Sequence, residues 1–276
     1  MKRMIKRILT YISIISLCLV FLLPIYGIVV ISFKTMGEFV QSYWGLPAEW
    51  HFSNYIEVWN KIAYGGLKYF YFNTFKITIP AVIISILLSC FAAYSLVTLK
   101  PKGGNSIFLM LIFGLTIPAQ ILIIPIYKML SLFYLFDTTI GMIWVHSAFG
   151  IPFCVFVLRN FMVSIPKEMN EAAILDGCSV MGVFWRIIMP LSIPALAVLI
   201  IFQFMGIYND LFFSLNLTYS NNVAPITVAM ARIATKFDIK WTLSATASII
   251  SSIPTIIVFV IFQKYFIKGI YMGAVK

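Results

Sequence analysis

A short polar stretch between two long apolar runs carries side chains suited to contact with another protein. It reads IPKEMNEAAILDGC from Ile165 to Cys178. Pro166 suits the first turn of a helix, and Gly177 suits the left-handed residue that ends one. The spacing therefore predicts a helix over about 166–176, which is too short and too polar to span a bilayer and should lie along its surface.

Two interpretations of this predicted helix stay open on residue chemistry alone. Ala172 and Ala173 would leave one side slim, so that another protein could approach closely, and Glu171 would offer a charge to that partner's basic or amide groups. The same residues suit an ordinary amphipathic connector whose acids are solvated. Ser179 can cap a second helix that leads into the next apolar run.

The elements that position this stretch are long apolar runs. Breaking the chain at charged residues gives six of them: 8–33, 77–99, 103–127, 138–158, 187–209 and 241–263. Each is long enough to cross about 30 Å of hydrocarbon as a helix, whereas barrel strands would alternate apolar and polar residues. The chain is 62% hydrophobic and 11% charged, against about half and a quarter in soluble domains. The fold class predicted is all-α, with residues 1–276 forming a single membrane domain of six transmembrane helices.

Prolines inside the spans predict kinks that neighbouring helices can tolerate. They are Pro118, Pro125, Pro190, Pro194 and Pro254.

The basic residues indicate an orientation. With the N-terminus in the cytoplasm, most of the 20 Lys and Arg residues fall on that side and most of the 9 acidic residues fall outside. The positive-inside rule then predicts that both termini are cytoplasmic. The net charge of +11 is spread over short connectors, so we expect contact with membrane lipid and none with nucleic acid.

Three connectors follow from this orientation. The cytoplasmic one covers about 165–190, and the outer ones cover about 34–76 and 210–240. The first outer connector carries Trp44, Trp50 and Trp59, which suit either an interfacial aromatic belt or a docking surface for an external partner. The sequence leaves both open.

The spans contain no obvious source of energy. None of the six includes Asp, Glu, Lys or Arg, whereas ion-coupled carriers usually keep such groups at membrane depth. His146 is the one titratable candidate, either a packing residue or a proton relay. Gln120, Gln203 and Asn209 could bond between helices or face a polar pathway. An uncharged pathway favours a neutral, hydroxyl-rich solute over an ion.

The chain also lacks the motifs of an enzyme. Gly177 and Gly182 have the first spacing of a phosphate loop, but Val183 and Phe184 replace the required Lys and hydroxyl residue. No metal-spaced His or Cys set and no nucleophile–base pair is evident, so we expect neither a catalytic nor a metal site. Any drive must come from a partner on the cytoplasmic face. An ion-coupled secondary carrier, a channel and an intramembrane enzyme are the rival interpretations.

The cytoplasmic connector resembles a known motif. The order Glu171-Ala172-Ala173, Asp176-Gly177 and then Pro190 is similar to the EAA loop of binding-protein-dependent ABC importer permeases. The likeness covers nearly the whole chain and points to the carbohydrate-importing branch, specifically its maltose-type second permease. The similar segments are NTF at 73–75, IPAQILIIPIY at 117–127, YNDLFF at 208–213 and GIYMGAVK at 269–276. Cys178 departs from the small residue, such as Ala, expected there.

The resemblance implies a permease subunit in the cytoplasmic (inner) membrane of a prokaryote. It implies a heterodimer with a second permease, two cytoplasmic ATPase subunits that bind ATP and Mg, and an external binding protein that delivers a sugar. The chain itself would need no cofactor. Segment 210–240 would contact the binding protein, and the coupling residues would be Glu171, Ala172, Ala173, Asp176 and Gly177.

Overall fold

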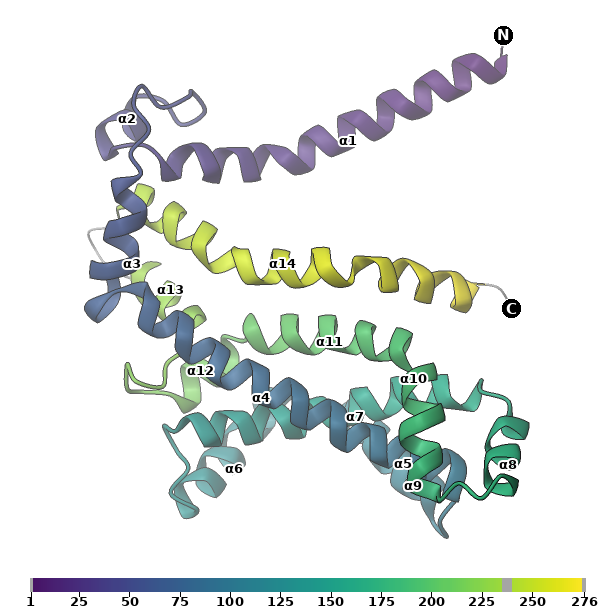
Figure 1. Ribbon diagram of the computed structural model, residues 1–276. Helices are drawn as coiled ribbons and strands as arrows, with labels where there is room; N and C mark the ends of the chain where they lie inside the picture. The colour runs from purple at the N-terminus through teal and green to yellow at the C-terminus, as the bar shows by residue number, and fades with distance from the viewer. Residues whose placement is uncertain (1, 235–239, 275–276) are drawn as a thin grey trace. The chain divides into compact units, whose positions relative to one another are not determined.

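The protein is helical throughout the part of the chain that the structure describes. The structure is a computed structural model that describes residues 2–234 and 240–274 (Figure 1). Within these residues it contains helices and no strand, which confirms the all-α prediction. The helices, in chain order, are α1 (Lys2–Ser32), α2 (Met36–Gln41), α3 (Ser53–Gly65), α4 (Leu67–Tyr94), α5 (Gly104–Gly114), α6 (Ala119–Leu132), α7 (Thr139–Val163), α8 (Lys167–Leu175), α9 (Val180–Val183), α10 (Met189–Leu191), α11 (Ile193–Tyr208), α12 (Phe212–Leu217), α13 (Ile226–Ala234) and α14 (Trp241–Ala274). Two π-helical turns, η1 (Ser95–Leu99) and η2 (Phe184–Ile188), continue α4 and α9.

Four of the expected membrane spans are unbroken helices among the described residues. They cover Arg3–Ser32, Leu67–Leu99, Thr139–Val163 and Trp241–Lys264. The other two are bent pairs, so the chain has up to six spans if each pair counts as one. The bent pairs lie in the predicted spans 103–127 and 187–209, and their breaks fall at Pro118 and between Pro190 and Pro194, where kinks are predicted.

Backbone chemistry explains both bends. The axes of α5 and α6 differ by 103°, and Pro118 stands between them in an extended conformation with ψ 129°. The axes of α9–α10 and α11 differ by 73°, and the break at Ser192 lies between Pro190 and Pro194, neither of which can donate a backbone hydrogen bond. Pro125 and Pro254 lie inside α6 and α14 without ending them.

The helices extend past the predicted spans into charged sequence. The span Leu67–Leu99 has 33 residues, about 50 Å at 1.5 Å per residue, which exceeds the roughly 30 Å of hydrocarbon. Lys76 therefore lies within α4, and Arg159 lies within α7. The predicted spans 77–99 and 138–158 remain free of charged residues, because Lys76 and Arg159 lie in the parts of the helices that extend beyond them. The outer segment 34–76 accordingly contains α2, α3 and the start of α4.

Two compact units divide the chain. One comprises Met1–Tyr71 with Val228–Ile253, and the other comprises Phe72–Thr227 with Pro254–Lys276. In the first unit α1 and α14 are tied together where Thr246 Oγ1 donates to the Ser32 carbonyl at 3.0 Å. The outer segment 210–240 contains α12 and α13, and its residues 235–239 lie outside the described residues.

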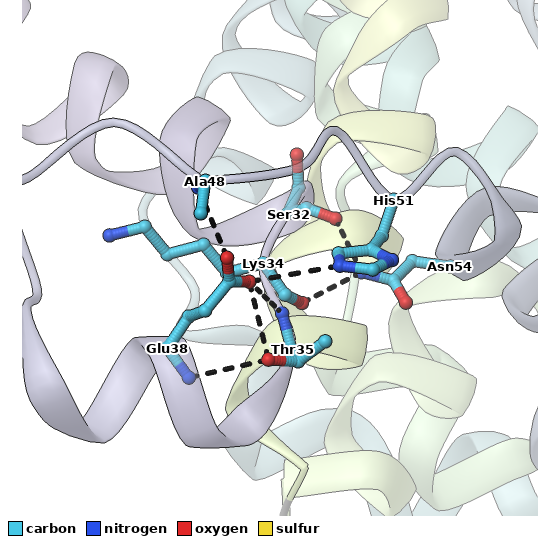
Figure 2. A network of polar contacts seen from close by, with 7 residues as sticks. All are labelled: Ser32, Lys34, Thr35, Glu38, Ala48, His51 and Asn54. Atoms are coloured by element: carbon cyan, nitrogen blue, oxygen red, sulfur yellow. Dashed lines mark hydrogen bonds and ion pairs between the residues drawn. The ribbon is translucent and has the colours of Figure 1, made fainter.

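A polar network folds the outer segment after α1 into a defined turn (Figure 2). Thr35 and Glu38 form a capping box at the start of α2. The Glu38 carboxylate also accepts from the Ala48 backbone N–H at 3.0 Å and lies 3.8 Å from His51 Nε2. These hydrogen bonds, first of all that from the Thr35 backbone, hold the pKa of Glu38 below its ordinary value of 4.5.

The same turn is fastened to the end of α1. Lys34 is buried and donates from Nζ to the Ser42 carbonyl at 2.6 Å. Asn54 Nδ2 donates to the carbonyls of Ser32 and Lys34 (Figure 2). Trp44 and Trp50 each remain about half exposed on this turn. These hydrogen bonds therefore hold the backbone of the turn that carries Trp44 and Trp50.

In the second unit the short helices gather at the two ends of α7. In Figure 1, α5, α8 and α9 lie near one end, and α6 and α12 lie near the other. The long helix α4 runs between these ends, since Asn73 Nδ2 donates to the carbonyls of Asn221 and Ala224 at one end and Tyr94 Oη donates to the Val180 carbonyl at the other.

Candidate coupling helix and polar core

The polar connector forms the predicted short surface helix. It is α8, Lys167–Leu175, and Pro166 stands at the N-cap, one position before the first turn in which it was expected. Gly177 has φ +84°, which confirms the left-handed conformation. The Cys178 N–H donates to the Ala173 carbonyl at 2.9 Å and the Gly177 N–H to the Ile174 carbonyl at 3.0 Å. This pair of bonds is a Schellman motif, which ends the helix at a defined residue.

The two alanines of α8 have different surroundings. Ala173 is buried and packs within its own chain, whereas Ala172 is exposed. The prediction that both form one slim outer side is therefore wrong for Ala173, because neighbouring positions on a helix point about 100° apart. Leu175 is 87% exposed, and Glu171 and Asp176 are exposed as well. The outer surface of α8 thus combines an apolar side chain, a methyl group and two carboxylates.

An aromatic cluster joins the connector to α4. Ser179 caps α9 by accepting from the Gly182 N–H at 3.1 Å, as predicted. Phe184 in η2 stacks on Phe91 with ring centroids 4.9 Å apart and also packs against Tyr94. Together with the Tyr94–Val180 hydrogen bond, these contacts fix the segment after α8 against a long helix. A displacement of this connector would therefore act on α4.

Gln203 lies in a packed helix junction. It is buried on α11, and its Nε2 donates to the Gly150 carbonyl on α7 at 3.3 Å. On α4, Ser89 Oγ donates to the carbonyls of Ser85 and of Ile151 on α7. A Cβ at Gly150 would stand 2.6 Å from Gln203 Oε1, so the absence of a side chain lets the three helices approach. The geometry gives Gln203 the interhelical role.

The other two pathway candidates lie in different surroundings. Asn209 is exposed at the C-cap of α11, where its Nδ2 donates to the Met205 carbonyl at 2.9 Å. Gln120 is exposed near the start of α6, directly after the bend at Pro118. No hydrogen bond of the described residues joins any two of Gln120, Gln203 and Asn209, so the structure does not bring them together as one site.

His146 is paired with a carboxylate that lies outside the six predicted spans, in the outer segment 210–240. The ring is 6% exposed, and Nε2 lies 3.8 Å from Asp210 Oδ2. Asp210 also accepts from the backbone N–H groups of Phe213 and Ser214, and its carbonyl accepts from Thr227 Oγ1. The pair therefore connects α7 to the segment after α11. Asp210 belongs to the YNDLFF segment noted in the sequence, but its partner could not be read from the sequence.

Comparison with known proteins decides the family. Residues 85–271 match the family described as "Binding-protein-dependent transport system inner membrane component". The chain belongs to this family of permeases. The matched region includes α8, its Schellman turn and the aromatic cluster, and the family resides in the inner membrane.

Similar permeases match along most of their length. "Melibiose/raffinose/stachyose import permease protein MelC" of Bacillus subtilis is 32% identical, with 98% of this chain and 96% of that protein covered. "Probable ABC transporter permease protein YurM" of the same organism is 30% identical, with 92% and 83% covered. "Diacetylchitobiose uptake system permease protein NgcG" of Streptomyces coelicolor is 30% identical, with 92% and 84% covered.

Solved structures show the same fold. A chain from a bacterial ABC transporter involved in the import of the acidic polysaccharide alginate superimposes with a TM-score of 0.84 at 24% identity, with 95% of this permease and 96% of that chain covered.

Proposed function

We propose that this permease is a subunit of an ABC importer for a sugar or oligosaccharide and forms half of its translocation pathway. The names of MelC and NgcG, which refer to oligosaccharide uptake, support this substrate class. Both termini would be cytoplasmic, and a second permease would complete a heterodimer.

The observation that carries the proposal is the geometry of α8. A nine-residue helix presents Ala172, Leu175 and two carboxylates to solvent, ends in a Schellman motif, and is followed by a segment fixed to α4 through Phe184 and Tyr94. Such a helix transmits displacement without deforming. We infer that it rests on one of two separate ATPase subunits, which bind the ATP and Mg that this chain does not bind itself.

Each coupling residue has a distinct part in this mechanism. Glu171 and Asp176 supply polar contacts to the ATPase subunit, and Ala172 allows close approach. Ala173 holds α8 against its own chain, and Gly177 fixes the end of the helix. ATP-driven closure of the ATPase pair would then move α8 and α4 together and switch the pathway between its inward- and outward-facing states.

An external solute-binding protein would deliver the sugar. The turn at 34–54 supports this, because its backbone is held by the polar network (Figure 2). Two of its side chains, Trp44 and Trp50, are about half exposed. Segment 210–234 is the second candidate contact, since Asp210 and Thr227 hold it to a fixed shape. A solved alginate importer in complex with a periplasmic binding protein has the same fold, with a TM-score of 0.66 at 15% identity.

Co-purification tests the proposal. The chain, extracted in detergent from its host, should bring down a second permease and an ATPase, and solute should stimulate ATP hydrolysis only when the binding protein is present. A proteoliposome that contains this chain alone should show no uptake under an ion gradient. Uptake there would instead support the ion-coupled carrier.

A further inference from the structure

A cavity of about 640 Å³ lies against one face of α8 in the second unit. Lys167, Asn170, Glu171 and Ile174 line it, and their spacing of three and four residues places them on a single side of the helix. The opposite wall comes from η1, the loop at 100–104 and the end of α7. The cavity therefore lies between this side of α8 and other parts of the same chain, and Glu171 borders it while remaining exposed to solvent.

The cavity carries excess positive charge. Lys100, Arg159 and Lys167 line it, against the single carboxylate of Glu171. Among the described residues none of these four side chains forms an ion pair. The Arg159 guanidinium lies over the Phe108 ring, 4.1 Å from its centroid. A guanidinium stacked in this way keeps its N–H edge for a planar or tetrahedral anion such as phosphate.

The backbone adds a second anion-binding feature. Lys100 and Gly103 have positive φ of 47° and 80°, which turn the chain sharply before α5 begins at Gly104. Gly104 and Asn105, the first residues of this 11-residue helix, line the cavity. The N-terminus of a helix carries partial positive charge, although the Gly104 N–H itself donates to the Pro101 carbonyl at 2.9 Å. Charge and backbone therefore favour the same kind of ligand.

A buried acceptor in the wall requires a donor. Asn170 Oδ1 is buried without a hydrogen-bond partner among the described residues, and Asn170 lines the cavity. Buried polar atoms are nearly always paired, so an orphan beside a cavity indicates a ligand group. Phosphate oxygens cannot donate to it when ionised, whereas a hydroxyl can.

We propose that this cavity binds a phosphate ester that carries a free hydroxyl. Lys100, Arg159 and Lys167 hold the phosphate, and the hydroxyl donates to Asn170 Oδ1. Both a glycerol-headed anionic phospholipid and a soluble glycerophosphate have this chemistry. The lipid source rests on the orientation in the proposed function, which puts this end of α7 at the cytoplasmic leaflet, where basic pockets between spans bind anionic headgroups. A bound ester would brace α8 against the loop at 100–104.

Binding to the full-length chain in nanodiscs tests the charge requirement. Phosphatidylglycerol titrated into phosphatidylcholine discs should bind the wild-type chain. Lys100→Gln should weaken binding by about tenfold or more, as expected for the loss of a direct hydrogen bond between charged groups. Arg159→Gln should weaken binding at least as much, and Arg159→Lys less. Lys102→Gln is the matched control, because Lys102 is in the same loop but does not line the cavity, and it should bind as wild type does.

Two further arms test the hydroxyl and the source. Phosphatidylmethanol, a phosphodiester of equal charge that has no headgroup hydroxyl, should bind more weakly than phosphatidylglycerol, and Asn170→Leu should abolish that preference. Glycerol 3-phosphate added to pure phosphatidylcholine discs should bind in the same charge-dependent way if the site takes a soluble ester, and should not bind if it takes the lipid alone.

The proposal is overturned if the wild-type chain, Lys100→Gln and Lys102→Gln all bind phosphatidylglycerol with the same affinity and also do not differ from one another in binding glycerol 3-phosphate. Because no ATPase or binding protein is present in this assay, its result is independent of whether α8 couples the permease to ATP hydrolysis.

Discussion

Replacement of Gly177 should separate ATP hydrolysis from transport. The residue has φ +84°, and a Cβ built on it would meet nothing within 4 Å. The cost of a side chain there is therefore conformational and not steric, about 1–2 kcal/mol for an L-residue in the left-handed region. A cost of that size lowers the population of the intact Schellman turn relative to the frayed end by a factor of about 5 to 30. The C-terminal end of α8 would then unwind when the ATPase subunit moves the helix.

The assay compares solute transported with ATP hydrolysed in proteoliposomes that contain the co-purified complex. Gly177→Ala should lower this ratio while the complex still assembles, and Gly177→Val should lower it further. Gly177→Asn should retain more of it, because Asn tolerates the left-handed conformation. Gly114→Ala is the neutral control, since Gly114 also has open space around it but lies in helical backbone.

Two results would refute this reasoning. A wild-type ratio in Gly177→Val would show that the turn does not carry the coupling. An equal defect in Gly177→Asn and Gly177→Ala would show that the defect does not arise from backbone strain.

Three other changes have defined outcomes. Gly150→Ala should lower the free energy of unfolding by about 1–3 kcal/mol, because the added Cβ would stand 2.6 Å from Gln203 Oε1. Thermal unfolding in detergent should show a lower midpoint. Gly206→Ala is the control and should leave the midpoint unchanged, because a Cβ at Gly206 has open space around it. Asp210→Asn should lower the same midpoint, because hydrogen bonds to a charged acceptor contribute about 1.5–3 kcal/mol and an amide nitrogen cannot accept; an unchanged midpoint would contradict the role assigned to the His146 pair. Glu38 has a lowered pKa in the folded protein. Its stabilisation of the outer turn is therefore complete above pH 4.5 and is lost as the pH falls through the folded pKa. The rate of proteolysis of the turn should rise over this acid range in the wild-type chain, and the same rise in Glu38→Gln would assign it to another group.

Local signals in the sequence were sufficient to predict where the helices of the cytoplasmic connector begin and end. Pro166, Gly177 and Ser179 determine the ends of α8 and the start of α9 within a few residues of chain, and the structure differs from the prediction only in the exact place of Pro166. Helix ends are encoded this way because caps bond to neighbouring backbone groups.

Features that depend on packing could not be predicted. His146 and Asp210 lie on different elements, and only the tertiary fold brings them within 3.8 Å. Ala172 and Ala173 are identical residues whose exposure differs because of what packs on α8. The true length of α4 was missed because Lys76 interrupts the apolar run, although a helix can continue through a charge once it leaves hydrocarbon.

Because α4 is continuous from Asn73 to Tyr94, the number of residues between them fixes the relative directions of these two side chains. Asn73 holds the segment at 221–224, and Tyr94 holds the start of α9. Since each residue advances a helix by about 100°, inserting or deleting one residue between these two positions would rotate one contact away while the other stayed in place. The number of residues in this stretch is therefore constrained, in addition to the identity of its packed residues such as Ser89 and Phe91.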